Sequence, residues 1–270
     1  MRTTTPARLN PINANRQAWD HSAALHRQSR NWQTLCADIQ YATFNCLDST
    51  LIARLNALGI AGKQVVQVGC NNGRECFALY SLGAAAVTGI DQSTEFLAQG
   101  AELNQLSPHE VQFVACDIHQ APAELRGQFD VLLITIGVLN WMPNLTAFFA
   151  AASALLRSGG QIVIYETHPL LEMLDPHSST PLQLANSYFQ AEPSVDYEAI
   201  VYEGAAPASE HPSVWFTHSL AEVFSALLAN DLQISHFAEY PHCNREECYE
   251  QYESQAIQLP MCYTLEACKR

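Results

Sequence analysis

Short, mainly apolar runs alternate with amphipathic stretches along most of the chain beyond residue 60. The runs are rich in valine, isoleucine and leucine, as expected of parallel strands buried on both faces, and the stretches between them carry apolar residues three and four positions apart, as helices do. Ser93-Thr94-Glu95 and Pro143-Asn144 are typical helix starts. The alternation predicts an α/β fold with a doubly wound sheet. We expect strands near 64–69, 85–90, 111–116, 129–135, 160–166, 232–238 and 261–267, and helices near 73–82, 93–106, 144–157 and 219–230.

Two segments depart from this alternation. We expect residues 1–50 to form an N-terminal helical cap segment, and residues 51–270 to form the main domain with an insertion at about 168–216 that acts as a lid. The insertion is rich in proline and shows little periodicity. An irregular stretch of that length inside a compact domain is usually a lid or a flexible insertion. A surface excursion without catalytic importance is the alternative.

A glycine-containing turn follows the first expected strand. Val65-Val66-Gln67-Val68 leads into Gly69-Cys70-Asn71-Asn72-Gly73, and Asp91 lies 22 positions beyond Gly69 at the end of the next strand. Glycines let the backbone turn tightly and approach a ligand, and an acid at this distance can accept hydrogen bonds from both hydroxyls of a ribose. The full G-x-G-x-x-G pattern and a Gly-Lys-Ser/Thr phosphate loop are absent, which argues against a pyrophosphate. The pattern therefore indicates an adenosine-containing ligand without phosphates, the profile of S-adenosylmethionine.

The order of motifs between residues 61 and 167 resembles that of class I S-adenosylmethionine-dependent methyltransferases. The motifs, in order, are Val65–Gly73, Gly89–Asp91, Ala115–Ile118, Phe129–Thr135 and Leu155–Gly160. Similarity to a bacterial subgroup of free-standing small-molecule enzymes extends over nearly the whole chain. The resemblance implies a Rossmann-like seven-stranded sheet in the order 3-2-1-4-5-7-6, with the last strand antiparallel, helices on both faces and a cap.

The same resemblance implies which residues bind the cofactor, S-adenosyl-L-methionine. The loop from Gly69 to Gly73 lines its methionine part, Asp91 holds the ribose hydroxyls, and Gln92 flanks the adenine, which Asp117 and Ile118 bind. Asn71 stands where the family has a glycine, and asparagine tolerates that backbone conformation better than most residues. The full set of implied cofactor-binding residues is Gly69, Cys70, Asn71, Gly73, Asp91, Gln92, Asp117, Ile118 and Thr135.

Polar residues after the fourth and fifth strands are candidates for chemistry. Methyl transfer is a displacement at carbon, so an enzyme must align the acceptor, exclude water and, for some acceptors, remove a proton. His168 titrates near neutral pH and is the candidate general base, although a histidine that only caps the strand end is the alternative. Asn140 is a candidate for holding a substrate or cofactor amine, with Trp141 offering a ring face to a cation. Glu166, as a partner of His168, a group that binds a substrate amine or a structural residue, and Tyr188 in the insertion complete the catalytic candidates.

Aromatic and histidine side chains in the cap segments are a weaker group. They either line the pocket or belong to the core, and aromatic residues at helical spacing are more often core. This group comprises Trp19, His21, His26, Tyr202 and His218.

The charge of the chain disfavours one class of partner. There are 13 lysines and arginines against 27 aspartates and glutamates, a formal net charge of -14. A nucleic-acid binder needs a basic surface to replace the counterions around phosphate, and docking on an anionic membrane needs one too. We therefore expect a small-molecule or carrier-bound substrate, no nucleic acid and no membrane partner, and a monomer or homodimer.

Short sequence patterns also predict the compartment, the redox state of the cysteines and whether a metal is bound. No apolar run reaches the ~18 residues of a membrane span, and Met1–Pro6 lacks the apolar core of a signal peptide, so we expect a cytoplasmic protein. The nine cysteines are unevenly spaced and odd in number, which favours reduced thiols. His242, Cys243 and Cys248 lie close together but form no C-x-x-C pair, so no metal is expected.

The predicted function is methyl transfer from S-adenosylmethionine to a small or carrier-bound acceptor. One alternative keeps the cofactor but not the reaction: attack of its own amine on the γ-carbon would form azetidine-2-carboxylate and expel methylthioadenosine, a step suited to natural-product biosynthesis. The other is a non-catalytic partner protein that only binds the cofactor. These alternatives differ in which bond to sulfur breaks, if any does.

Overall fold

The computed structural model describes residues 9–202, 204–245 and 247–270. The first eight residues of the predicted cap segment, with the expectation made for Met1–Pro6, lie outside the described residues.

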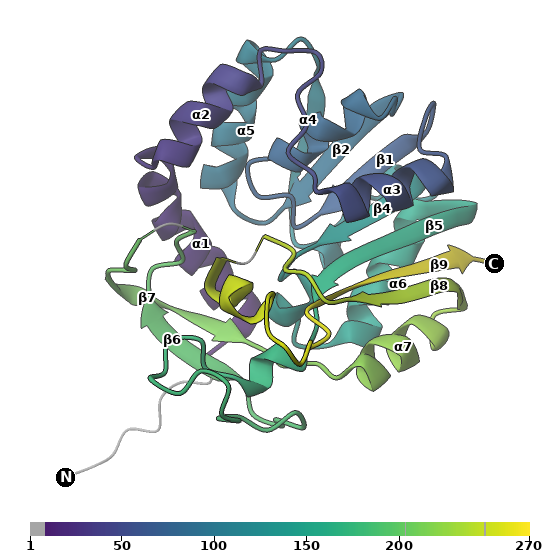
Figure 1. Ribbon diagram of the computed structural model, residues 1–270. Helices are drawn as coiled ribbons and strands as arrows, with labels where there is room; N and C mark the ends of the chain where they lie inside the picture. The colour runs from purple at the N-terminus through teal and green to yellow at the C-terminus, as the bar shows by residue number, and fades with distance from the viewer. Residues whose placement is uncertain (1–8, 203, 246) are drawn as a thin grey trace.

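A seven-stranded sheet in the order β3-β2-β1-β4-β5-β9-β8 forms the centre of the molecule (Figure 1). The first five strands pair in parallel, and β9 runs antiparallel to both β5 and β8. The predicted strands and their order are confirmed. The strands are β1 (Gln64–Val68), β2 (Ala86–Asp91), β3 (Val111–Ala115), β4 (Phe129–Thr135), β5 (Leu156–Thr167), β8 (Leu232–Tyr240) and β9 (Cys262–Lys269).

Helices cover both faces of the sheet. Helices α3 (Ser49–Leu58), α4 (Arg74–Ser81) and α5 (Thr94–Leu106) pack on one face, and α6 (Leu145–Leu155) and α7 (Leu220–Leu228) on the other. Both predicted helix starts are confirmed, because the side chains of Ser93 and Asn144 accept hydrogen bonds from the first turns of α5 and α6. In the described part of the chain, five short 3₁₀ helices lie in the connections: η1 (Ile118–Gln120), η2 (Ala123–Leu125), η3 (Leu139–Trp141), η4 (Leu171–Met173) and η5 (Glu247–Tyr252).

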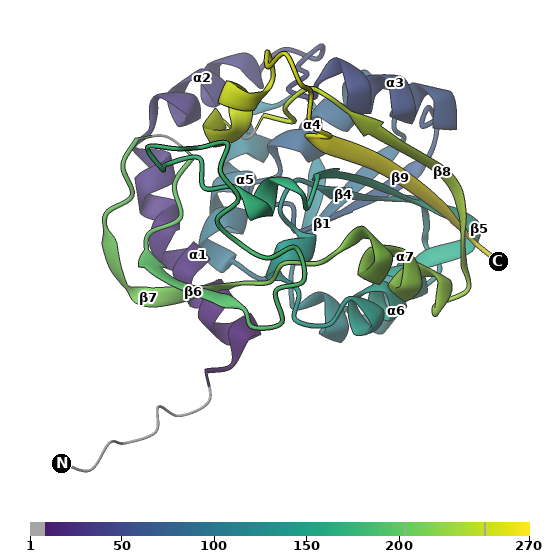
Figure 2. The same cartoon turned by 60° about the horizontal axis from the view of Figure 1, so that its bottom comes forward.

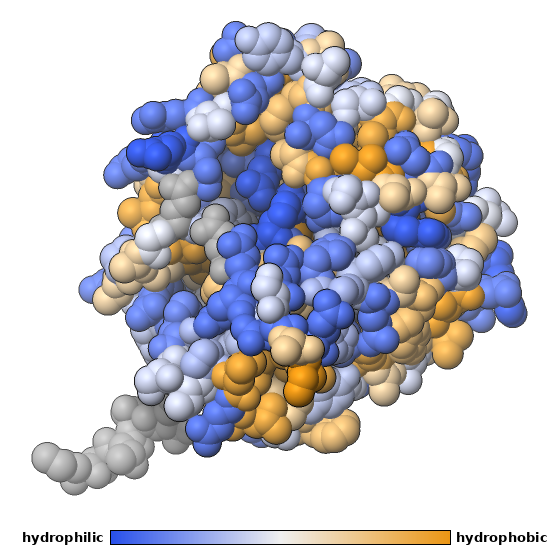
Figure 3. All heavy atoms as spheres, in the orientation of Figure 1, coloured by the Kyte–Doolittle hydropathy of each residue, from blue (hydrophilic) through white to orange (hydrophobic). Residues whose placement is uncertain are grey.

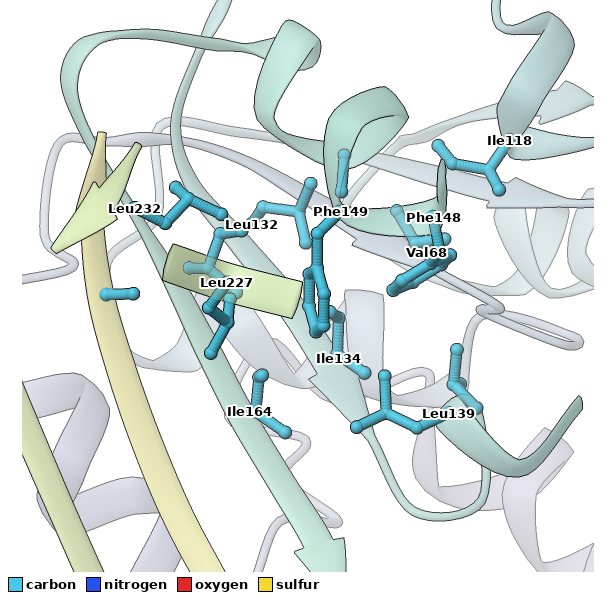
Figure 4. Close-up of a cluster of buried hydrophobic side chains, with 14 of the residues drawn as sticks. Val68, Ile118, Leu132, Ile134, Leu139, Phe148, Phe149, Ile164, Leu227 and Leu232 are labelled. Atoms are coloured by element: carbon cyan, nitrogen blue, oxygen red, sulfur yellow. The ribbon is translucent and has the colours of Figure 1, made fainter. Parts of the chain in front are cut away.

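Strand β4 is buried along its whole length and separates two apolar layers. Its residues Leu132 and Ile134 belong to one layer together with Phe149 of α6 and Leu227 of α7 (Figure 4). Its alternate residues belong to the layer beneath α3 and α4. Full burial of each such aliphatic side chain contributes ~1.5–3 kcal/mol. The strand ends at the site are therefore held by a packed core on both sides.

The insertion contains an antiparallel pair of strands, β6 (Ser194–Glu198) and β7 (Ala208–Trp215), where we expected an irregular lid. The sequence gives only a weak sign of them. Val195 and Tyr197 alternate with polar residues in β6, but the alternation covers five residues, all of them exposed, and Pro212 interrupts β7. The pair lies beside the N-terminal helix α1 (Pro11–Arg27) in both views (Figures 1 and 2). Helix α2 (Arg30–Asp38) follows, and α3 runs across the expected boundary at residue 50.

Hydrogen bonds join α1 and the insertion into one cap. The fully buried Asn15 side chain donates from Nδ2 to the Val214 carbonyl at 2.9 Å and accepts from the Val214 N–H at 2.7 Å. Ser22 Oγ, also buried, accepts from the Ile200 N–H at 2.9 Å. Because buried polar groups are costly without partners, these contacts tie the two segments firmly, although they are far apart in sequence.

The surface is mixed. On the face in Figure 3, hydrophilic side chains cover the middle and apolar side chains gather in separate patches. Within the described ranges, no helix is both long and apolar enough to cross a bilayer.

Candidate active site

A large hollow, here called the main hollow, lies where the strands β1 to β4 end and the cap closes over them. It holds about 760 Å³ of empty space, including the part open to solvent. Ligands of open α/β sheets sit at this position. Its lining residues are Ile12, Trp19, Val68, Gly69, Asn71, Ile90, Asp91, Gln92, Cys116, Asp117, Ile118, Ile136, Val138, Trp141, Met142 and Tyr202.

The glycine loop contains three residues in the left-handed region, Gly69, Asn71 and Gly73. Gly69 has φ +67° and Asn71 has φ +55°, so asparagine adopts the glycine-like conformation that we predicted for it. The N–H groups of Gly69 and Cys70 both donate to the Ile90 carbonyl, at 2.8 and 3.1 Å, which fixes the loop to the end of β2. A side chain at Gly69 would place its Cβ only 2.7 Å from Val138. The loop can therefore approach a ligand only with glycine at this position.

Substituting Gly69 with alanine is expected to lower stability by about 1–3 kcal/mol and to weaken cofactor binding by roughly tenfold, because strain adds to a clash with Val138. Gly127→Ala is the matched control: Gly127 has the same φ of +67° but no atom within 4 Å of its added Cβ. It should cost about 1 kcal/mol through strain alone. Urea denaturation and calorimetric titration measure both. Equal effects of the two substitutions would contradict the role of the clash.

Asp91 is held at the rim of the main hollow by backbone groups. Its Oδ2 accepts from the Asn71 N–H at 2.7 Å, and its Oδ1 accepts from the Ser93 N–H at 2.8 Å. Burial raises the pKa of Asp91 above its ordinary value, although the N–H groups of Ser93 and Asn71 act in the opposite direction. Each carboxylate oxygen can accept a second hydrogen bond. The group is thus oriented to accept bonds from a pair of neighbouring hydroxyls.

The cap is attached beside this carboxylate. Asp20 of α1 accepts from the Ser93 hydroxyl at 2.7 Å, and Gln99 of α5 donates to the Ala23 carbonyl of α1 at 2.7 Å. Asp117, which also lines the main hollow, is the N-cap of η1 and accepts from the His119 N–H at 3.0 Å. Asp91 and Asp117 thus line the main hollow together with Ile12 and Trp19 of α1.

Aromatic side chains form the cap side of the main hollow. The rings of Trp19 and Trp141 meet edge-on with centroids 5.5 Å apart, and Tyr202 lies 6.2 Å from Trp19. Trp215 packs edge-on against Trp141 at 4.7 Å. The sequence named Trp19 and Tyr202 only as lining or core, and the structure places both at the pocket. Such a wall is apolar and offers ring faces to a cation.

Three of the predicted cofactor residues do not line the main hollow. Within the loop, the Cys70 side chain is buried, and Gly73 is the N-cap of α4, with φ +76° and the ring of Phe113 against it. Thr135 is buried, and its hydroxyl donates to Glu75 Oε2 at 2.6 Å. The other six, Gly69, Asn71, Asp91, Gln92, Asp117 and Ile118, line the main hollow.

A buried polar network that the sequence did not reveal underlies the loop. Glu75 of α4 accepts from Gln67 Nε2 and Thr135 Oγ1, each at 2.6 Å, and pairs with Arg245 Nη2 at 2.5 Å. Burial alone would raise the pKa of Glu75, but Arg245, Arg74 and the Thr135 hydroxyl outweigh it and hold the pKa below its ordinary value. Because Arg245 comes from the connection between β8 and β9, this ion pair joins the end of the sheet to the glycine loop.

Glu166 and Asn140 do not face the main hollow. Glu166 lies at the end of β5, 2% exposed, and accepts from the Gly137 N–H at 2.5 Å and the Leu139 N–H at 3.2 Å. Asn140 in η3 donates from Nδ2 to the Phe216 carbonyl at 2.8 Å. Both residues line a second, smaller hollow. Tyr188 is farther along the insertion, where its hydroxyl accepts from the Leu220 N–H at 3.1 Å at the start of α7.

His168 lines neither hollow. Its Nδ1 accepts from the Leu170 N–H at 3.1 Å, so its Nε2 carries the hydrogen and donates to Glu239 Oε1 at 2.9 Å. Burial lowers the pKa of His168, while Glu239 acts in the opposite direction. The structure thus places both ring nitrogens in hydrogen bonds at the strand end, and Glu239, not Glu166, is its partner.

The histidines and cysteines form neither a metal site nor disulfides in the part of the chain that the structure describes. Among the residues with described positions, no group of three or more His, Cys, Asp or Glu side chains could hold a metal ion. His242 bonds instead to the Thr50 hydroxyl at 2.8 Å. All nine cysteines are free thiols, as the uneven spacing predicted.

The fold and the site are those of a nucleotide-binding Rossmann-like protein. The sheet has this strand order, and a cap covers a glycine loop and an acid at the end of β2. Residues 61–198 match the family described as Methyltransferase domain. The chain belongs to this methyltransferase family.

Similar proteins agree with this assignment. The chain is 30% identical over 106 residues to a tRNA U34 carboxymethyltransferase of Alcanivorax borkumensis, covering 39% of this chain and 32% of that protein. It is 36% identical over 107 residues to a ubiquinone biosynthesis O-methyltransferase of Pseudomonas aeruginosa, covering 39% and 45%. The chain therefore spans less than half the length of these curated relatives. An S-adenosylmethionine-dependent methyltransferase from Mesorhizobium loti shares the fold, with a TM-score of 0.55, 19% identity and coverage of 80% of this chain and 96% of that one.

Proposed function

We propose that the chain transfers the methyl group of S-adenosylmethionine to a small-molecule acceptor. The observation that carries this proposal is the carboxylate of Asp91, which two backbone N–H groups orient at the rim of the main hollow, next to the left-handed Gly69 and Asn71. A ribose on Asp91 places the methionine part along Gly69 and the adenine towards Asp117 and Ile118, which line the same hollow.

The chain's own residues position the reactants and exclude water. Bound S-adenosylmethionine supplies a methyl carbon activated by positive sulfur. The backbone at Gly69 and Asn71 admits the ligand closely, and Trp141 presents an apolar ring where a cation is stabilised. The cap, with Trp19 and Tyr202, covers the opposite side and keeps the main hollow largely apolar.

The residues that line the main hollow favour catalysis by alignment of the methyl acceptor over catalysis by removal of a proton from it. Its ionisable residues in the described part of the chain are Asp91, Asp117, Cys116 and Tyr202. Two of these face the cofactor, and burial raises the pKa of the Cys116 thiol, which therefore stays protonated at neutral pH. A positioned acceptor that is nucleophilic without a protein base fits this surface best.

The acidity of the chain supports a small or carrier-bound acceptor over a nucleic acid. One relative is named for tRNA and another for ubiquinone biosynthesis, so the names alone leave both classes open. The formal net charge of -14 opposes binding of a polyanion. A role in natural-product biosynthesis and a cytoplasmic location are part of the same proposal.

Two measurements test this function. Calorimetric titration should show binding of S-adenosylmethionine and of S-adenosylhomocysteine. Incubation with S-adenosylmethionine labelled in the methyl group, together with pooled small metabolites or with bulk tRNA, should label a small molecule and release S-adenosylhomocysteine. Label in tRNA would contradict the acceptor class. Methylthioadenosine formed from S-adenosylmethionine alone would replace transfer by cyclisation. Binding without formation of either product would leave a non-catalytic protein that binds the cofactor, and absence of binding would contradict the proposal.

A further inference from the structure

Asp117 and His119 form a polar pair at the edge of the main hollow. Asp117 lines the main hollow as the N-cap of η1, and His119 is the second residue of that 3₁₀ helix. Both side chains are partly buried, with 20% of the Asp117 side chain and 25% of the His119 side chain exposed. The pair acts on a ligand only through the atoms that it leaves free, so the hydrogen bonds of each oxygen decide its role.

The two oxygens of the Asp117 carboxylate have different surroundings. Oδ1 accepts from the His119 backbone N–H at 3.0 Å and lies 2.7 Å from His119 Nδ1. Because a carboxylate can only accept, the ring carries its hydrogen on Nδ1 and donates it to the same oxygen. Oδ2 makes no hydrogen bond to any residue with a described position. Oδ2 is therefore the acceptor that remains for a ligand in the main hollow.

The His119 ring does more than the helix cap requires. An N-cap aspartate accepts from a backbone N–H in the first turn, and the His119 N–H already fills that role. The ring adds a second contact to the same oxygen, and hydrogen bonds to a charged acceptor are roughly twice as strong as those between neutral groups. With Oδ1 held twice, the carboxylate cannot rotate to exchange its two oxygens.

The backbone around this pair is fixed by other contacts. Ile118, between the two residues, is 5% exposed and belongs to the same apolar layer as Phe148 of α6 (Figure 4). The Cys116 N–H donates to the Asp91 carbonyl at 3.0 Å, which ties the end of β3 to the end of β2. Because the backbone is held in this way, the orientation of the Asp117 carboxylate depends on its own side-chain contacts.

We propose that His119 is a positioning residue that makes the main hollow selective for a purine with an amino group at C6. That amino group is a donor and matches the acceptor Asp117 Oδ2. A 6-oxopurine has an acceptor at the same place, and its nearest donor, N1–H, is displaced by one atom along the ring. An Asp117 carboxylate fixed by His119 cannot turn to follow that donor. The inference rests on the proposed function, because the purine is the adenine of S-adenosylmethionine.

The test compares two ligands that differ only in this group, S-adenosylhomocysteine and its 6-oxo analogue S-inosylhomocysteine. Calorimetric titration of the full chain at pH 7 should show at least about tenfold tighter binding of S-adenosylhomocysteine. His119→Ala should lower the affinity for S-adenosylhomocysteine about tenfold, because a charge-assisted contact is lost. It should leave the affinity for S-inosylhomocysteine unchanged, so the ratio of the two affinities falls towards one.

Two further variants separate positioning from support of the fold. In His119→Asn, the amide Nδ2 takes nearly the place of the ring Nδ1 and can donate to Asp117 Oδ1, so this variant should keep most of the selectivity. His177→Ala removes an exposed histidine that lines neither hollow and should change neither affinity.

An equal loss of affinity for both ligands in His119→Ala would show that the ring only supports η1, and would overturn the inference. So would unchanged selectivity in His119→Ala, lost selectivity in His119→Asn, or equal binding of the two ligands by the unaltered chain. Failure of the proposed function is seen separately. If the unaltered chain binds neither ligand, the cofactor site is wrong and the inference falls with it, whereas selective binding without methyl transfer contradicts only the proposed reaction.

Discussion

Asp91→Ala is expected to weaken S-adenosylmethionine binding by roughly 100-fold or more while the chain stays folded. Two hydrogen bonds from ribose hydroxyls to a charged acceptor are worth ~1.5–3 kcal/mol each, and alanine removes both. The loss of affinity is larger still because the N–H groups of Asn71 and Ser93 lose their hydrogen-bond acceptor, and the glycine loop is then held less firmly. Calorimetric titration of S-adenosylmethionine measures the effect, and circular dichroism checks the fold.

Asp91→Asn separates the charge from the shape of this side chain. The amide keeps one acceptor oxygen, so its loss of affinity should lie between those of the unaltered chain and Asp91→Ala. An unchanged affinity in Asp91→Ala would contradict the assignment of the ribose site, and with it the orientation of the cofactor in the main hollow.

The pH dependence of binding follows from the raised pKa of Asp91. The carboxylate form accepts the ribose hydroxyls, and protonation removes acceptor capacity. Because the folded pKa lies above the ordinary value of about 3.9, affinity should begin to fall with decreasing pH while a free aspartate is still ionised. Titrations across the acidic range should show this decline in the unaltered chain and not in Asp91→Asn. A flat profile in both would contradict the role of the carboxylate.

Local sequence patterns predicted the sheet and, at the main hollow, the glycine loop and Asp91. Apolar runs mark buried strands whatever their partners, so the seven strands and their order followed from the sequence and the resemblance. The glycine loop and Asp91 were found because turn chemistry and an acid after β2 are readable within about 20 residues. Asn71 was expected in a glycine-like conformation and adopts it.

Contacts between distant segments could not be predicted in this way. Arg245 pairs with Glu75 across 170 residues, and neither position carries a pattern that names the other. His168 follows β5 as expected, but its partner Glu239 comes from β8 and turns it away from the hollows. The strands β6 and β7 escaped detection because their surroundings are solvent and α1, not a second apolar layer. In each case a contact with a segment distant in sequence determines the structural role, and no local pattern indicates that contact.

Arg245→Met is expected to destabilise the chain by about 3–5 kcal/mol at neutral pH, because it leaves the charge of Glu75 buried without its partner. Arg245 has φ +79°, but methionine also carries a Cβ, so the backbone strain is the same in both. The exposed pair between Arg27 and Glu102 provides the control, since Arg27→Met should cost no more than about 1 kcal/mol. Urea denaturation of both variants measures the difference.

The pH dependence of this effect identifies its cause. The pKa of Glu75 is lowered in the folded chain, so its ion pair stabilises the fold above the unfolded pKa of about 4.3 and this contribution is lost as the pH falls through the folded pKa. The difference between Arg245→Met and the unaltered chain should therefore shrink at acidic pH, where Glu75 in the variant is protonated. Adding Glu75→Gln to Arg245→Met removes the buried charge while keeping hydrogen bonds to Gln67 and Thr135, and should restore much of the lost stability. If Arg245→Met stays within about 1 kcal/mol of the unaltered chain at neutral pH, the ion pair does not hold the glycine loop to the end of the sheet.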